Sequence, residues 1–249
     1  MEITKKKVGF ITSSLLLKTG FSNHARRILP FLYKTGKYAL FHLNQGFPDG
    51  HPDFQRFPWH NEGAMRKGTF DEGRYNNPAE EGYRRHVSYG NCAVRDFIIR
   101  NQLDVIIHIE DIWSSSPEAY FKADWWPYFK DNFLQHSTAD STPILPQFKE
   151  WAENCPNFWF WSSFAEKAVK QENLQKYGHT KTVPGCIDKN EYLPILKHEK
   201  LELRKKFNID PDTIIFFQLG RNQLRKLYPF SIDAFSKFKK RNPNIKSKL

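Results

Sequence analysis

Cysteine is scarce in this 249-residue sequence, with only Cys92, Cys155 and Cys186. The three are odd in number, far apart and without metal-ligand spacing. This pattern argues against both a disulfide framework and a structural zinc site. We therefore expect reduced thiols in a cytoplasmic protein.

Long apolar runs are also missing. No stretch approaches the roughly 18 apolar residues that a membrane span needs. The basic start, Lys5–Lys7, is followed by mixed residues and no small-residue cleavage site, so a signal peptide is not expected. A content of 39% hydrophobic and 16% aromatic residues is typical of a globular chain. Its length allows one large or two modest domains.

Acidic residues are depleted only near the carboxyl end. Residues 196–249 carry 14 Lys and Arg against 5 Asp and Glu, a net charge of +9 out of +11 for the whole chain. A basic segment of this kind is compatible with a nucleic acid, an anionic membrane surface or a phosphate-bearing ligand.

Strand-like and helix-like segments alternate through the first part of the chain. Expected strands are Val8–Thr12, Tyr38–Leu43, Leu103–Ile109, Asn157–Trp161 and Thr180–Val183. Expected helices run from Ser22 or Asn23 to Lys34, from Asn91 to Asn101, and from Ser163 to Tyr177, closed by Gly178. Strands separated by helices predict an α/β fold with a parallel, doubly wound, Rossmann-like sheet. Residues 44–85 are rich in Gly, Pro, Asn and charge and predict a long loop.

A second α/β unit begins after residue 195. Its expected elements are a helix at Leu201–Phe207, a strand at Thr213–Leu219 and a helix at Pro229–Arg241. We expect a domain at 1–195 and an incomplete Rossmann-like domain at 196–249. One strand and two helices cannot close a nucleotide pocket, so the apolar side chains of Ile214–Phe217 should be exposed.

A possible anion clamp follows the strand at 213–219. Gly220 frees the backbone there, and Arg221 and Lys226 supply a planar fork and a point charge for phosphate oxygens. Arg225 is an alternative to Lys226. The competing interpretation is that these are solvated cations of a basic segment.

Five motifs, in this order, resemble glycosyltransferase family 4. They are TGFSNH at 19–24, DVIIH at 104–108, VPGCID at 183–188 with Tyr192 and Pro194, GR-x4-K at 220–226, and DAF at 233–235. Members of this family are retaining, nucleotide-sugar-dependent enzymes of the GT-B fold. The resemblance extends from Val8 to Pro243, although residues 44–85 match no named motif.

The resemblance implies roles for three of these residues. Arg221 and Lys226 correspond to family cations that bind the donor diphosphate without a metal. Gly20 corresponds to a glycine at the donor phosphate or sugar, but the family usually has two glycines where this chain has Thr19 and Gly20. An ordinary strand-to-helix turn is the alternative for Gly20.

The same resemblance implies the binding partners. The donor would be a nucleoside-diphosphate sugar, with no further cofactor, and the acceptor a saccharide, lipid or protein. Family carboxyl-terminal domains can also face acidic lipids, so a peripheral membrane contact is compatible with the basic segment, whereas nucleic acid is not expected.

The acceptor side is less sharply defined. Family members often place a histidine close to the transferred sugar, and the resemblance puts residues 137–143 at the corresponding position, which suggests Asp140 as a catalytic residue or His136 nearby. A turn aspartate and a surface histidine are the plainer alternatives. Trp125 and Trp126 fall in an expected loop and are open to an acceptor-binding role, whereas the aromatic residues at 158–161 should be core.

Two acidic motifs resemble metal sites. His108 is followed by Glu110 and Asp111, but strand alternation separates Asp111 from the other two, so His108 should be a hydrogen-bonded core histidine. The Asp-x-Asp motif of Asp210 and Asp212 is explained by a proline turn. We expect no metal.

The paired glutamates that the family carries on its carboxyl-terminal domain are not found in a matching context. We therefore interpret the chain as a fragment or a natural truncation and expect little activity from residues 1–249 alone. The alternatives are a nucleic-acid or anionic-surface binding protein on a Rossmann-like domain, and an inactive acceptor-binding remnant.

Overall fold

The chain divides into two compact units. The computed structural model describes residues 4–68, 70–172 and 179–249. Unit 1 is Met1–Asp188 and unit 2 is Lys189–Leu249. The division after Asp188 falls a few residues before the expected domain boundary at 195.

Unit 1 is built on one parallel sheet of seven strands in the order β3-β2-β1-β4-β5-β6-β7. The strands are β1 (Lys6–Ser13), β2 (Tyr38–Pro48), β3 (His60–Met65), β4 (Val105–Ile109), β5 (Phe133–Ser137), β6 (Asn157–Phe160) and β7 (His179–Thr182). Val8 of β1 lies opposite Leu40 of β2 and Val105 of β4. The Rossmann-like, doubly wound fold class is therefore confirmed.

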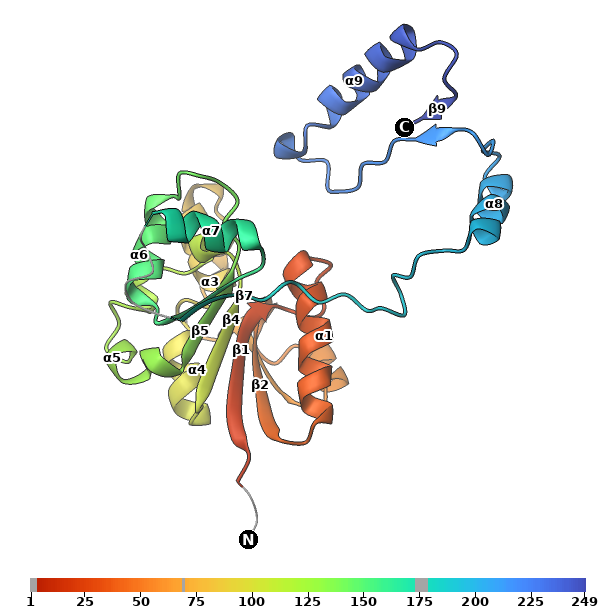
Figure 1. Ribbon diagram of the computed structural model, residues 1–249. Coiled ribbons are helices and arrows are strands. Elements are labelled where there is room, and N and C mark those ends of the chain that lie inside the picture. Colours follow the sequence, from red (N-terminus) through yellow and green to blue (C-terminus); the bar gives the residue numbers. More distant parts are fainter. Residues whose placement is uncertain (1–3, 69, 173–178) are drawn as a thin grey trace. The chain divides into compact units, whose positions relative to one another are not determined.

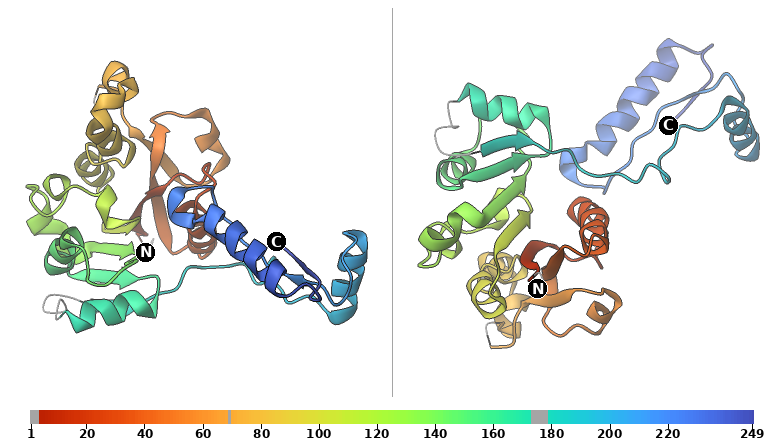
Figure 2. Two further views of the ribbon diagram at one scale, coloured as in Figure 1. Left: turned by 90° about the horizontal axis from the view of Figure 1, so that it is seen from above. Right: turned by 60° about the horizontal axis from the view of Figure 1, so that its bottom comes forward.

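Helices cover both faces of this sheet (Figures 1 and 2). α1 (Gly20–Lys34) buries Ala25 and Leu29 against Phe10 on one face. The other face is covered by α4 (Val94–Asn101), α6 (Pro146–Asn154) and α7 (Ser163–Gln171). Adjacent residues of β1 alternate between the two cores, because successive strand side chains point to opposite faces. The expected end of α7, at Tyr177 and Gly178, lies outside the described residues.

The start of α1 differs from the expected one. Thr19, not Ser22 or Asn23, is the N-cap, and its Oγ1 accepts the backbone N–H of Ser22 at 3.0 Å. The helix thus begins at Gly20, immediately after the loop that leaves β1.

The expectation of a long loop at 44–85 was wrong. β2 runs to Pro48, β3 adds an edge strand, and α2 (Glu72–Asn76) and α3 (Glu81–Ser88) follow, with short 3-10 turns at Pro52–Arg56 and Pro78–Glu80. β3 contains the buried carboxylate of Glu62, which forms ion pairs with Arg66 and Arg100. A charge inside a strand is tolerable because these partners compensate its burial, and one of them, Arg100, is distant in sequence.

The region between β4 and β6 also contains more structure than expected. β5 lies there, together with α5 (Trp126–Phe129) and 3-10 turns at Ile112–Ser114, Pro117–Ala119 and Lys130–Asn132. Trp125 and Trp126 are buried in the core rather than exposed in a loop, which excludes the acceptor-binding role suggested for them. Of the aromatic residues at 158–161, Phe158 and Phe160 are buried as expected, whereas Trp159 and Trp161 are only half-buried.

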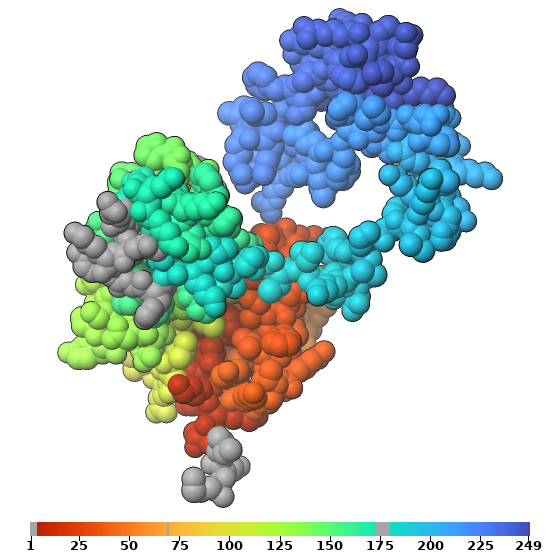
Figure 3. Space-filling view, in the orientation of Figure 1, coloured from red at the N-terminus to blue at the C-terminus, as the bar shows by residue number. Residues whose placement is uncertain are grey.

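Unit 2 is a small, open arrangement. α8 (Lys197–Lys206) and α9 (Tyr228–Arg241) flank the short parallel pair β8 (Ile214–Ile215) and β9 (Ser247–Lys248), with a 3-10 turn at Leu224–Lys226. The expected strand therefore ends at Ile215 and does not reach Leu219. The side chains of Ile214–Phe217 are exposed, as predicted. Figure 3 shows these segments in blue.

Within the described ranges, no helix is both long enough and apolar enough to cross a bilayer.

Candidate active site

The candidate site lies at the carboxyl edge of the sheet in unit 1. β1 pairs with β2 on one side and with β4 on the other, so the strand order reverses there. In open α/β sheets, ligands bind outside the carboxyl ends of the strands at such a switch point. Ser13 ends β1, Glu110 follows β4 and Ser137 ends β5, so these residues mark the site.

A buried carboxyl group lies at the centre of this edge. Glu110 is 3% exposed, and its Oε2 accepts a hydrogen bond from Ser13 Oγ at 2.9 Å. Burial raises the pKa of Glu110 to about 8, against the lowering effect of the Ser13 hydrogen bond. At neutral pH the side chain is therefore mainly protonated and can donate or accept a proton.

Sequence reasoning had considered Glu110 only as a metal ligand beside His108. His108 is a buried core histidine, as expected, packed parallel to Tyr120 with ring centroids 5.5 Å apart. Burial lowers its pKa to about 3. In the part of the chain that the structure describes, no group of three or more His, Cys, Asp or Glu could hold a metal ion.

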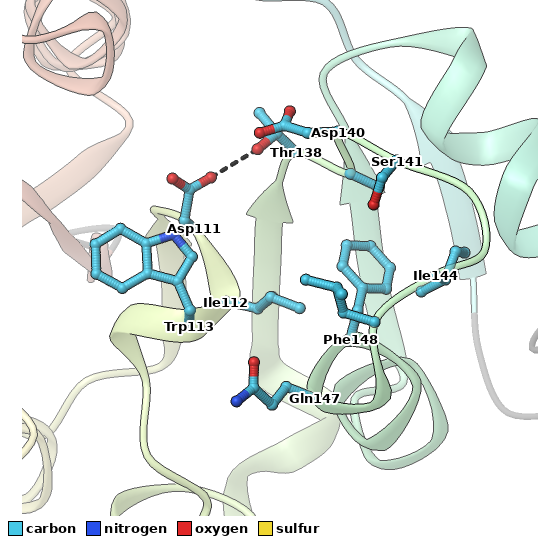
Figure 4. A pocket seen from close by; sticks show the side chains of 11 residues that line it. Asp111, Ile112, Trp113, Thr138, Asp140, Ser141, Ile144, Gln147 and Phe148 are labelled. Atoms are coloured by element: carbon cyan, nitrogen blue, oxygen red, sulfur yellow. Dashed lines mark hydrogen bonds between the residues drawn. The ribbon is translucent and has the colours of Figure 1, made fainter. Parts of the chain in front are cut away.

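Asp140 lies at the rim of a small pocket beyond β4 and β5 (Figure 4). The pocket has a volume of about 90 Å³. Its polar side holds Asp111, whose Oδ1 accepts a hydrogen bond from Thr138 Oγ1 at 2.6 Å. Ile144 and Phe148 form its apolar side. Asp140 is exposed, so the structure brings it near Asp111 but leaves it in solvent.

His136, the alternative to Asp140, is buried rather than at the surface. Its Nε2 lies 2.8 Å from the carbonyl oxygen of Val183, and its ring stacks on Trp161 at 5.4 Å. His24 of α1 lies beside it, with ring centroids 5.3 Å apart. Burial, and secondly the charge of His136, lower the pKa of His24 to about 4.

These two histidines tie the segment after β7 to α1. His24 Nδ1 accepts the backbone N–H of Cys186 at 2.9 Å, and Arg27 pairs with Asp188 at 3.3 Å. Gly185 fits closely here, because an added Cβ would lie 3.0 Å from the Trp161 ring. The segment 183–188 is thus held along α1, and His136 has a structural contact instead of an open catalytic position.

Gly20 begins α1 at the same edge of the sheet. A Cβ added to Gly20 would meet no atom within 4 Å, so no neighbouring group requires a glycine there. The space outside the helix N-terminus is open, which leaves room for a ligand. The first N–H groups of a helix favour an anion in that position.

Arg221 and Lys226 both belong to unit 2. Their loop is held by Tyr228, whose hydroxyl donates to the Gly220 carbonyl at 2.7 Å, and by Gln218, whose Nε2 donates to the Lys226 carbonyl at 2.7 Å. The Lys226 side chain lies close to Gly220. Both cations are exposed, and neither forms an ion pair with a described residue.

Comparisons with known proteins found similarity to solved structures alone. No family model and no curated protein matches the chain. Among solved structures, part of a sucrose-phosphate synthase from Thermosynechococcus elongatus is similar at 15% identity and a TM-score of 0.43. The match covers 82% of this chain and 97% of that one. Similarity this distant carries no information on activity, so function is inferred below from the chain's own residues.

Proposed function

We propose that this chain is part of a glycosyltransferase that moves a sugar from a nucleoside-diphosphate sugar to an acceptor. Unit 1 would supply the acceptor side and unit 2 the beginning of the donor side. The observation that carries the proposal is the edge of the sheet at the switch point. There, α1 begins at Gly20 in open space, and Glu110 holds a buried, protonatable carboxyl beside Ser13.

Anion stabilisation is the main chemical demand of this reaction. The bond between sugar C1 and the diphosphate oxygen breaks, and the diphosphate leaves with the electron pair. The acceptor hydroxyl oxygen bonds to C1 and loses its proton. Arg221 and Lys226 would neutralise the departing diphosphate, as preorganised cations do without a metal ion. The α1 N-terminus at Gly20 would add partial positive charge.

Donor turnover tests the proposal. The purified natural protein should release nucleoside diphosphate from one member of a panel of UDP-, ADP- and GDP-sugars when acceptors are present. No release from any member, with intact folding, would argue against a transferase.

The exposed basic residues of unit 2 favour one rival, binding to a nucleic acid or an anionic surface. α9 ends with Lys239, Lys240 and Arg241, none of them buried. Strongly salt-dependent DNA binding, together with no response to any nucleotide sugar, would favour this rival.

A further inference from the structure

A second and larger pocket opens beside Gly20 in unit 1. It has a volume of about 440 Å³ and lies at the carboxyl ends of β1 and β2, under α2 and α3. Ser13 and Thr19 line it from the β1 side, and Gln45 from β2. Tyr75 and Arg84 line it from the helices. This volume is suitable for a small molecule.

The charge of the lining is positive. Arg85 also lines the pocket but is paired with Glu81 at 2.5 Å. The Arg84 side chain is half-buried and forms no ion pair or hydrogen bond with any residue that the structure describes. Glu110, directly behind Ser13, is mainly protonated at neutral pH because burial raises its pKa to about 8. One guanidinium is thus left without a counter-charge.

The remaining lining suits hydroxyl groups. Ser13 Oγ donates to Glu110 and keeps its lone pairs for a ligand hydroxyl. Tyr75 and Ser88 lie with their hydroxyls 3.2 Å apart on the helix side of the pocket. A guanidinium fork binds carboxylate and phosphate oxygens in pairs, which makes Arg84 a specific anion contact.

We propose that this pocket binds the acceptor of the transfer reaction, and that the acceptor is a polyhydroxylated molecule with one carboxylate or phosphate group held by Arg84. The inference rests on the proposed function, since it assigns the second substrate of that reaction. It places the anionic group on α3 and the hydroxyl groups toward Ser13, at the end of β1.

Calorimetric titration with three probes tests the anion site. Glucose 6-phosphate and glucuronate should bind at least about tenfold more tightly than glucose, because charge-assisted hydrogen bonds are the strong ones. Their relative affinities separate a phosphate from a carboxylate preference. Arg84→Gln should lower the affinity for both anionic probes about tenfold or more and leave the affinity for glucose unchanged. Arg56→Gln removes an exposed cation outside the pocket and should have no effect.

Folding does not confound this test, because Arg84 has no ion pair with a described residue to lose, so Arg84→Gln should keep the melting temperature. Equal affinity for glucose and the anionic probes, or no effect of Arg84→Gln, would overturn the inference. Displacement of the probes by a nucleoside diphosphate would also overturn it, since the pocket would then belong to the donor.

Failure of the proposed function gives a different result. If the anionic probes bind through Arg84 but no nucleotide sugar is turned over, the transferase assignment fails and the anion site stands. If a donor is turned over and Arg84→Gln leaves the acceptor KM unchanged, only the acceptor inference fails.

Discussion

Replacing Glu110 with Gln should stabilise the protein in a pH-dependent way. The carboxyl is 3% exposed and its main partner is the Ser13 hydroxyl. Glutamine has nearly the same shape, can accept the same hydrogen bond and never ionises. The variant therefore removes the cost of keeping a titratable carboxyl buried.

The magnitude follows from the shift in pKa. Burial raises the pKa of Glu110 from 4.5 to about 8. Between these values the unfolded chain is ionised while the folded protein retains the proton, so the folded state loses stability as pH rises. Each pH unit in this range lowers the free energy of unfolding by about 1.4 kcal/mol, so the total loss at pH 7 is about 3 kcal/mol. Above pH 8 the folded carboxyl ionises too, and the cost levels off.

Urea unfolding of the wild type and Glu110→Gln from pH 4.5 to 9 measures this difference. Buried histidines such as His108 also change stability with pH, but they contribute equally to both proteins and cancel. The free energy of unfolding of the variant should rise relative to that of the wild type by about 3 kcal/mol between pH 4.5 and 7. Glu153→Gln changes an exposed carboxyl and should show no such trend. A constant gap across this range would refute the buried, protonated state of Glu110.

Two further predictions concern packing in unit 1. Trp151→Ala should lower the free energy of unfolding by about 3–5 kcal/mol, because the ring is fully buried and packs edge-on against Tyr120 at 5.2 Å. A loss near zero in urea titration would contradict the core assignment. Gly185→Ala should cost about 1–3 kcal/mol, since its Cβ would press on the Trp161 ring. Gly82→Ala, where a Cβ meets open space, is the control, and equal melting temperatures for the two variants would contradict this reasoning.

The alternation of strands and helices predicted the Rossmann-like sheet because its central strands are apolar. β3 was missed because it carries a buried Glu62, and only the folded protein shows the compensation. Burial by itself raises the pKa of Glu62, but hydrogen bonds from His60 and Asn101 and the charges of Arg66 and Arg100 lower it to about 2. β5 was missed for a similar reason, since its Gln135 and His136 are buried polar residues.

The candidate site was predictable only in part. Gly20 was singled out because a glycine before a helix is a local signal, and the structure places it at the start of α1. Glu110 was not assigned a role of its own, because its burial depends on the pairing of β4 with β1 and β5, which sequence periodicity does not specify. Its position directly after an apolar strand was the one signal that could have identified it.

Donor turnover by Arg221→Ala tests the central claim most directly. In the protein as its gene encodes it, the variant should lose about 2–4 kcal/mol of transition-state stabilisation, a fall in kcat/KM of roughly 30- to 1,000-fold, with folding nearly unchanged. Arg221→Lys should recover only part of this loss, because the two-pronged geometry is gone. Arg241→Ala, which removes an exposed cation at the end of α9, should keep the wild-type rate. Full activity and donor affinity in Arg221→Ala would contradict the diphosphate clamp.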